Sequence, residues 1–211
     1  MKIVSTLSAA LFAALVLVSS AEAQDALKSR TYHFGTHPAR TSVTFVSEAD
    51  IETIHGVSNA LQGSIKVDAT GKAGSGTLRV PVSSMKTGIA LRDEHLRSDA
   101  WLDAKRHPYV TLQLVSAKAT RSDPKTWDYT ANLTIKGVTK RVTGKAKVSA
   151  IPDKFSAALG GGSWVRVRAK FDVKLADHGI QVPQRIGAKV SQTWQIGIDV
   201  YGTTNAPKAR R

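Results

Sequence analysis

The sequence predicts an all-β fold: an extended antiparallel β-barrel of about eight strands, with one short amphipathic helix inserted near residues 93–105. Two observations support this prediction. Apolar and polar residues alternate with a period of two through most of the chain, so each strand has one dry and one wet face. A single segment departs from that period and follows the helical one instead.

The clearest strand is residues 164–175, where apolar side chains alternate with Arg, Lys and Asp. Similar alternation predicts strands at residues 41–46, 61–68, 77–82, 109–115, 128–135, 141–148 and 190–202. Strands with one apolar face can hide it in a two-sheet sandwich or in a closed barrel. Closure removes exposed strand edges, which favours the barrel.

The helical segment begins at Asp93, whose side chain is a candidate N-cap. Leu96, Ala100 and Trp101 form one apolar stripe, and Pro108 prevents continuation of the helix. Most charges of this segment fall on the opposite, wet face. We therefore expect a short amphipathic helix between two antiparallel strands.

The first residues have the pattern of a secretory signal peptide. Lys2 precedes an apolar run over residues 7–18, and Ala-Glu-Ala occupies residues 21–23. We expect cleavage after Ala23, a single barrel domain over residues 24–204 and a basic tail over residues 205–211. No other segment is apolar enough to span a membrane, so we expect a soluble, exported protein, periplasmic in a double-membrane bacterium.

Composition limits the chemistry. The chain has no cysteine, which excludes disulfides, thiol chemistry and thiolate metal sites, and its formal net charge is +14. A strongly basic protein is drawn to anionic surfaces such as a membrane, although the charge also serves solubility alone. We do not expect nucleic acid as a partner, because the chain is exported and its basic faces lack interleaved aromatic residues.

Several spaced motifs resemble the YceI-like family. The stretch SSMKTGIALRDEHLRSDAWLDAKRHPYVTL is similar to its signature, and NLTIKGVTKRV, GVSNALQGSI and ADHGI resemble further segments. The matching signature positions are Ser84, Thr87, Gly88, Arg92, Asp93, His95, Leu96, Ser98, Asp103 and Pro108. The likeness runs from about Tyr32 to Gly202. The chain departs from the family pattern at His37, Arg40, Trp101-Leu102 and His178.

This resemblance implies an exported, lipocalin-like barrel that binds a polyisoprenoid, an isoprenoid quinone or another long-chain amphiphilic lipid, for storage or transport. An eight-stranded barrel is either filled by its side chains or holds one small ligand. The candidate lining residues are Val165, Val167, Phe171, Val173, Ile196 and Ile198. Leu91, Leu96, Trp101 and Leu102 are candidates for a lid, and Arg92 and His178 for contacts with a headgroup. For the apolar positions, packing in a solid core is the alternative.

Two other functions remain open. One is an enzyme acting on an envelope lipid through Asp93, Glu94 and His95; the other is a basic, solid-cored protein that docks on envelope surfaces. Catalysis is the weaker interpretation, because no G-x-S-x-G motif is present and the six histidines lack metal-ligand spacing. We expect no catalytic residue, no metal and no cofactor other than a bound lipid; a homodimer remains open.

Overall fold

The computed structural model describes residues 29–70 and 73–207. The predicted signal peptide at residues 1–23 and the last four residues of the basic tail lie outside this part of the chain. Within it, no helix is long and apolar enough to cross a membrane.

Ten strands make up almost all of the regular structure. They are β1 Arg30–Phe34, β2 Thr41–Glu48, β3 Thr53–Ser58, β4 Gln62–Val67, β5 Ala73–Pro81, β6 Tyr109–Ala119, β7 Thr126–Ile135, β8 Val138–Ile151, β9 Trp164–Lys174 and β10 Thr193–Thr203. The helices are α2 Ala90–Arg97 and α3 Asp153–Ser156, and the 3-10 turns are η1 Pro38–Arg40, η2 Val82–Ser84, η3 Ala157–Leu159, η4 Leu175–His178 and η5 Gln184–Ile186.

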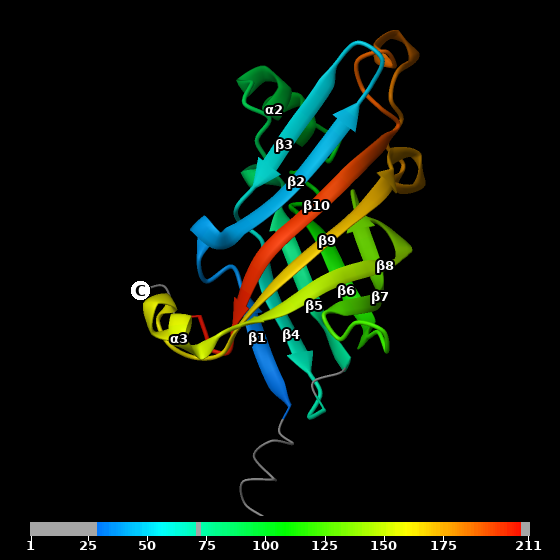
Figure 1. Cartoon of the computed structure of the whole chain (residues 1–211). Helices are drawn as coiled ribbons and strands as arrows, with labels where there is room; N and C mark the ends of the chain where they lie inside the picture. The colour runs from blue at the N-terminus through cyan, green and yellow to red at the C-terminus, as the bar shows by residue number, and fades with distance from the viewer. Residues whose placement is uncertain (1–28, 71–72, 208–211) are drawn as a thin grey trace, which may run out of the picture.

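The strands form one closed sheet. Its order is β1-β4-β5-β6-β7-β8-β9-β10-β2-β3, and β1 also pairs with β10. Strands β1 and β2 follow one another along the same edge of β10, with β4 and β3 as their respective neighbours. Strands β1 and β2 therefore take the place of one interrupted strand of the barrel. Strands β4 and β3 take the place of a second one. The result is the predicted eight-stranded antiparallel barrel (Figure 1).

Strand β9 illustrates why the apolar phase points inward. Ala169 lies opposite Ile198 of β10 and Ala146 of β8, and Phe171 lies opposite Ile196. The intervening Arg168 and Lys170 are exposed. Alternation along one strand thus becomes a layer of apolar side chains across three strands, which is the burial that drives the sheet to close.

The helix differs from its predicted position. It spans Ala90–Arg97, and the chain then turns rather than continuing as a helix to residue 105. The predicted N-cap role of Asp93 is wrong, because Ile89 occupies that position and Asp93 lies inside the helix. The apolar stripe led to the wrong position, because Trp101 and Leu102 pack against the barrel core from a turn. Their spacing in the sequence is the same as that of apolar residues on a further helical turn.

The two ends of the barrel carry different connections. In Figure 1 the β2–β3 hairpin, α2 and the chain between β9 and β10 lie at the upper end. The end of β4, the start of β1 and α3 lie at the lower end. This polarity matters, because the cavities described next lie in series between these ends.

Candidate functional site

The barrel contains three neighbouring cavities. The lower chamber, about 430 Å³, adjoins the neck, about 90 Å³, through Leu78, Leu112, Phe171 and Ile198, which line both. The mouth, about 340 Å³, meets the neck at Phe45 and Trp194. Because each cavity shares wall residues with the next, the three form one series along the barrel.

The neck is the most apolar of the three. Every residue in its wall except Thr44 carries a hydrocarbon, thioether or aromatic side chain. A hydrocarbon chain makes no hydrogen bonds, so it loses none when it moves from water into the neck. This transfer is favourable by about 0.8 kcal/mol per CH₂ group. The neck therefore suits a chain rather than a polar headgroup.

Stacked aromatic rings separate the neck from the mouth. Phe45 and Trp194 stack with centroids 5.1 Å apart, and Trp101 stacks on Trp194 at 6.2 Å. Gly56 of β3 is required for this arrangement, because a Cβ there would lie 1.9 Å from Cζ of Phe45. The Phe45 ring thus lies flat over its cross-strand partner.

Three segments meet around the mouth. Arg92 of α2 donates to Glu52 in the β2–β3 hairpin at 2.5 Å. The backbone N–H of Ile51 donates to the carbonyl of Ala188, in the chain after η5, at 3.0 Å. Ile51, Ile89 and Leu91 nevertheless remain exposed at 68%, 50% and 61%. The mouth therefore has a fixed polar frame and an apolar outer rim.

Asp93 fixes the loop before α2 and is no free acid. It is buried and accepts hydrogen bonds from the backbone N–H and the hydroxyl of Thr87, at 2.6 and 2.8 Å. Burial alone would raise its pKa, but these hydrogen bonds, with the charges of Lys86 and Arg97, outweigh burial and lower it. The carboxylate is thus held ionised in a structural role.

Asp103 has a similar role after the helix. It is buried, has a left-handed backbone with φ 51°, and accepts from Nε of Arg106 at 2.5 Å. Burial opposes ionisation of Asp103, but hydrogen bonds from the backbone and side chain of Arg106, with electrostatic interactions from Arg106 and His107, lower its pKa overall. The sequence had placed this residue on the wet face of a helix, whereas the structure uses it to close a turn.

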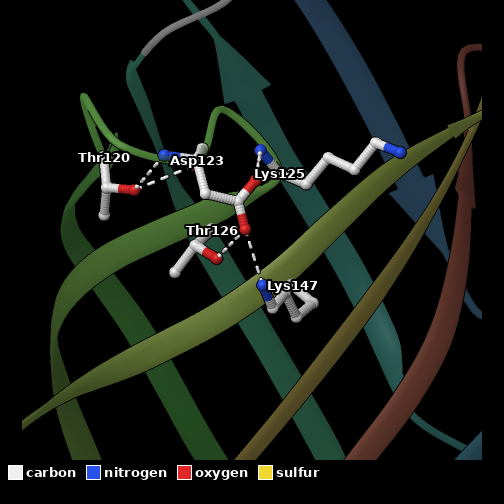
Figure 2. A network of polar contacts seen from close by, with 5 residues as sticks. All are labelled: Thr120, Asp123, Lys125, Thr126 and Lys147. Carbon is white, nitrogen blue, oxygen red and sulfur yellow. Dashed lines mark hydrogen bonds and ion pairs between the residues drawn. The ribbon is translucent and has the colours of Figure 1, made fainter.

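The lower chamber is bordered by a hydrogen-bonded connection between β6 and β7. Asp123, in the loop between β6 and β7, accepts from the backbone N–H of Lys125 at 2.9 Å, the Thr126 hydroxyl at 2.7 Å and Lys147 Nζ at 2.6 Å. Figure 2 shows this network, with Thr120 bound to the same loop. The neighbouring Pro124 belongs to the chamber wall, so the network holds part of that wall in place.

The candidate lining residues are divided among the cavities. Val165 and Val167 line the lower chamber, Val173, Ile196 and Leu102 the neck, and Phe171 and Ile198 both of these. Leu91, Leu96, Trp101 and Arg92 line the mouth. Leu96 is buried, whereas Leu91 is mostly exposed, so these two lid candidates differ in their environment.

His178 lies apart from all three cavities. It is 3% exposed, and its Nδ1 lies 2.9 Å from the carbonyl of Val138, which can only accept, so Nδ1 carries the proton. This contact joins η4 to the start of β8. The buried imidazole thus pairs with a backbone carbonyl and does not face a cavity where it could contact a headgroup.

Sequence reasoning missed several residues of the cavity walls. Phe45, Trp194 and Tyr129 lie on the apolar phases of recognised strands. Their position was therefore predictable, but the stacking at the neck was not, because it joins residues of β2, β10 and the turn after α2. In the described part of the chain, no group of three or more His, Cys, Asp or Glu residues could hold a metal ion.

A closed antiparallel barrel of eight strands with internal apolar cavities defines the class of lipocalin-like barrels. The chain belongs to the YceI-like family, since the model of the YceI-like domain matches residues 34–201. This confirms the resemblance seen in the sequence motifs. A curated relative from Pseudomonas aeruginosa, named UPF0312 protein, is 33% identical over 134 residues, or 61% of this chain and 64% of the relative. The chain thus spans slightly less than two thirds of that protein.

Solved structures agree on the fold. Burkholderia cenocepacia BcnA matches with a TM-score of 0.67 at 20% identity, over 79% of this chain and 99% of that one. A polyisoprenoid binding domain from Saccharophagus degradans, implicated in plant cell wall breakdown, matches with a TM-score of 0.60 at 16% identity, over 83% and 99%. At these identities the likeness establishes the shared architecture.

Proposed function

We propose that this protein binds a polyisoprenoid, an isoprenoid quinone or another long-chain amphiphilic lipid inside the barrel, for storage or transport. The observation that carries the proposal is the series of lower chamber, neck and mouth, whose walls are mostly apolar. Burial of a prenyl chain of about ten CH₂-equivalents would contribute roughly 8 kcal/mol before the costs of association. The polyisoprenoid-binding description of one structural neighbour supports the same ligand class.

A binding role is favoured over catalysis. Asp93 and Asp103, the buried acids of the signature segment, are occupied by structural hydrogen bonds. His95 is exposed at the mouth, and its carbonyl accepts hydrogen bonds from the backbone N–H and the hydroxyl of Ser98. We therefore propose a carrier or store whose lipid is cargo, with no catalytic cofactor. The internal cavities also argue against the alternative of a solid-cored docking protein.

We further propose that lipid enters at the mouth from an anionic membrane of the compartment to which residues 1–23 direct the chain, the periplasm in a double-membrane bacterium. Ile89 and Leu91 are exposed in the wall of the mouth, as is the basic Lys189. The exposed Ile51 and Arg185 directly precede Glu52 and Ile186 of the same wall. Basic residues near an anionic bilayer contribute about 1 kcal/mol each, and this attraction weakens with salt. Leu91→Glu should then weaken binding to phosphatidylglycerol vesicles, whereas Leu91→Ala should weaken it less.

The experiment for the ligand is mass spectrometry of an organic extract of the purified mature protein. The expected result is a prenyl or other long-chain lipid at near-equimolar ratio to protein. A parallel titration with an isoprenoid quinone and a long-chain fatty acid covers loss of lipid during purification. An empty extract together with no binding of either lipid would overturn the proposal.

A further inference from the structure

The hydroxyl of Tyr129 lies inside the barrel without a partner. Tyr129 is 7% exposed, and its hydroxyl oxygen is buried with no hydrogen bond in the described part of the chain. It comes from the inward face of β7 and lines the lower chamber. Because a buried hydroxyl that lost its water contacts costs free energy unless something pairs with it, this group requires an explanation.

Small residues surround the Tyr129 side chain. The Tyr129 ring lies across its cross-strand partner Gly144, where a Cβ would come within 2.7 Å of the hydroxyl oxygen. Ala117, Ala146 and Ala169 pack around Tyr129 from β6, β8 and β9, and all three line the lower chamber. A phenylalanine would fill the same ring position, so packing accounts for the ring but not for the oxygen.

The chamber suits an uncharged partner. Among the residues that the structure describes, the charged ones in its wall are Arg30 and Asp68, which have opposite signs and so do not form a cationic pocket for a phosphate. The described residues of the neck wall include no charged side chain. Burying an unpaired charge costs far more than burying a neutral oxygen. Burial also raises the pKa of Tyr129, which keeps the hydroxyl neutral and able to donate at physiological pH.

We propose that Tyr129 donates a hydrogen bond to an uncharged oxygen at the polar end of the bound lipid. This places the polar end in the lower chamber and the hydrocarbon chain along the neck, towards the mouth. The inference rests on the proposed lipid-binding function and adds to it a residue that selects the ligand and fixes its direction. A quinone carbonyl and an alcohol share the required chemistry.

Trp194 offers the competing arrangement. Its indole Nε1–H is also buried without a partner, and it lies where the neck meets the mouth. A lipid bound in the opposite direction would pair its oxygen with Trp194 instead. The lower chamber is favoured because its volume of about 430 Å³ exceeds that of the mouth, about 340 Å³, and a headgroup is wider than its chain.

The test uses lipids that differ in one oxygen. The purified mature protein, freed of lipid, is loaded with the fluorescent hydrocarbon diphenylhexatriene, which is then displaced with phytanol or with phytane, the matching hydrocarbon. The measured quantity is the ratio of the two dissociation constants, phytane over phytanol. Tyr129→Phe should lower this ratio about tenfold, the factor that 1.4 kcal/mol produces. A quinone with four isoprene units, compared with phytane, distinguishes a carbonyl from an alcohol.

Tyr109→Phe is the matched control, because Tyr109 is 37% exposed at the start of β6 and lines none of the three cavities. It should leave the ratio within twofold. An unchanged ratio in Tyr129→Phe, for the alcohol and the quinone alike, overturns the inference and assigns the hydroxyl to bound water. The inference is also overturned if Trp194→Phe lowers the ratio and Tyr129→Phe does not. Failure of all probes to bind the wild type would contradict the lipid-binding function itself.

Discussion

Phe45 and Trp194 stack face to face between β2 and β10, with an angle of 17° between their planes, at the boundary of the mouth and the neck. A lipid that enters from the mouth has to pass these rings. Trp101 stacks on Trp194 and is only partly buried. The aromatic group therefore lies where a lipid bound as proposed would pass between the mouth and the neck.

Trp101→Ala should accelerate release of a bound lipid several-fold, because it removes the outer ring of the stack. The stability cost should be about 2 kcal/mol, below the usual range for a fully buried tryptophan. Stopped-flow displacement of diphenylhexatriene measures the rate, and urea unfolding measures the stability. Leu91→Ala is the control: this exposed side chain should change stability by less than about 0.5 kcal/mol. Equal release rates in wild type and Trp101→Ala would contradict a role of the rings in access.

Gly56→Ala should destabilise the barrel by about 2 kcal/mol or more, because the new Cβ would occupy the position of the Phe45 ring. Gly74→Ala is the matched control on β5, where the added Cβ would meet its nearest neighbour, Ile65, at 3.4 Å. The control should be nearly neutral. Urea unfolding of both variants checks this difference, and a Gly56→Ala midpoint equal to that of Gly74→Ala would disprove the tight approach.

Asp93→Ala should cost about 2 kcal/mol, since it removes two charge-assisted hydrogen bonds from Thr87 and leaves the Thr87 donors unpaired. Asp99→Ala removes an exposed carboxylate from the same segment and should have little effect. Thermal unfolding compares the two. If Asp93→Ala unfolds like Asp99→Ala, the loop before α2 does not depend on this contact.

Asp123 should make stability depend on pH in the acid range. Hydrogen bonds from Lys147, Thr126 and the backbone of Lys125 hold the pKa of Asp123 well below its usual value. The unfolded carboxyl titrates near 3.9, so the stabilisation is fully present above that pH and is lost as the pH falls towards the lower folded value. The stability difference between wild type and Asp123→Asn should be largest near pH 7 and shrink below about pH 4. Urea midpoints between pH 7 and pH 2.5 measure it; a gap that widens on acidification would contradict the network of Figure 2.

The alternating pattern was sufficient to predict the barrel. In β9, the alternation of Val165, Val167, Phe171 and Val173 with charged residues determined which face is buried, because a strand has only two faces. It could not determine whether the interior is filled. That depends on small residues such as Ala117 and Ala169 meeting across the barrel from distant strands.

The signature segment was harder to interpret. Its charged residues suggested either a catalytic site or the solvated face of a helix. In the structure, Asp93 and Asp103 are buried and hold turns in place. A helical period over residues 93–105 cannot be distinguished in sequence from a short helix followed by a turn, because both place apolar side chains at similar intervals. The turn is fixed by Asp103 and its left-handed backbone, which only the structure reveals.

The most direct test of the account is lipid binding by a barrel whose lower chamber has been filled. Ala169→Trp adds a large side chain to the chamber, and Lys170→Trp adds the same side chain to the outer face of β9. Circular dichroism and thermal unfolding establish that each variant is folded, with Ala146→Phe as a second filling variant. The account predicts that a long-chain isoprenoid quinone binds the wild type and Lys170→Trp with similar affinity, and the filled barrel at least tenfold more weakly. Equal affinity for all of these folded proteins would place the ligand elsewhere and contradict the central claim.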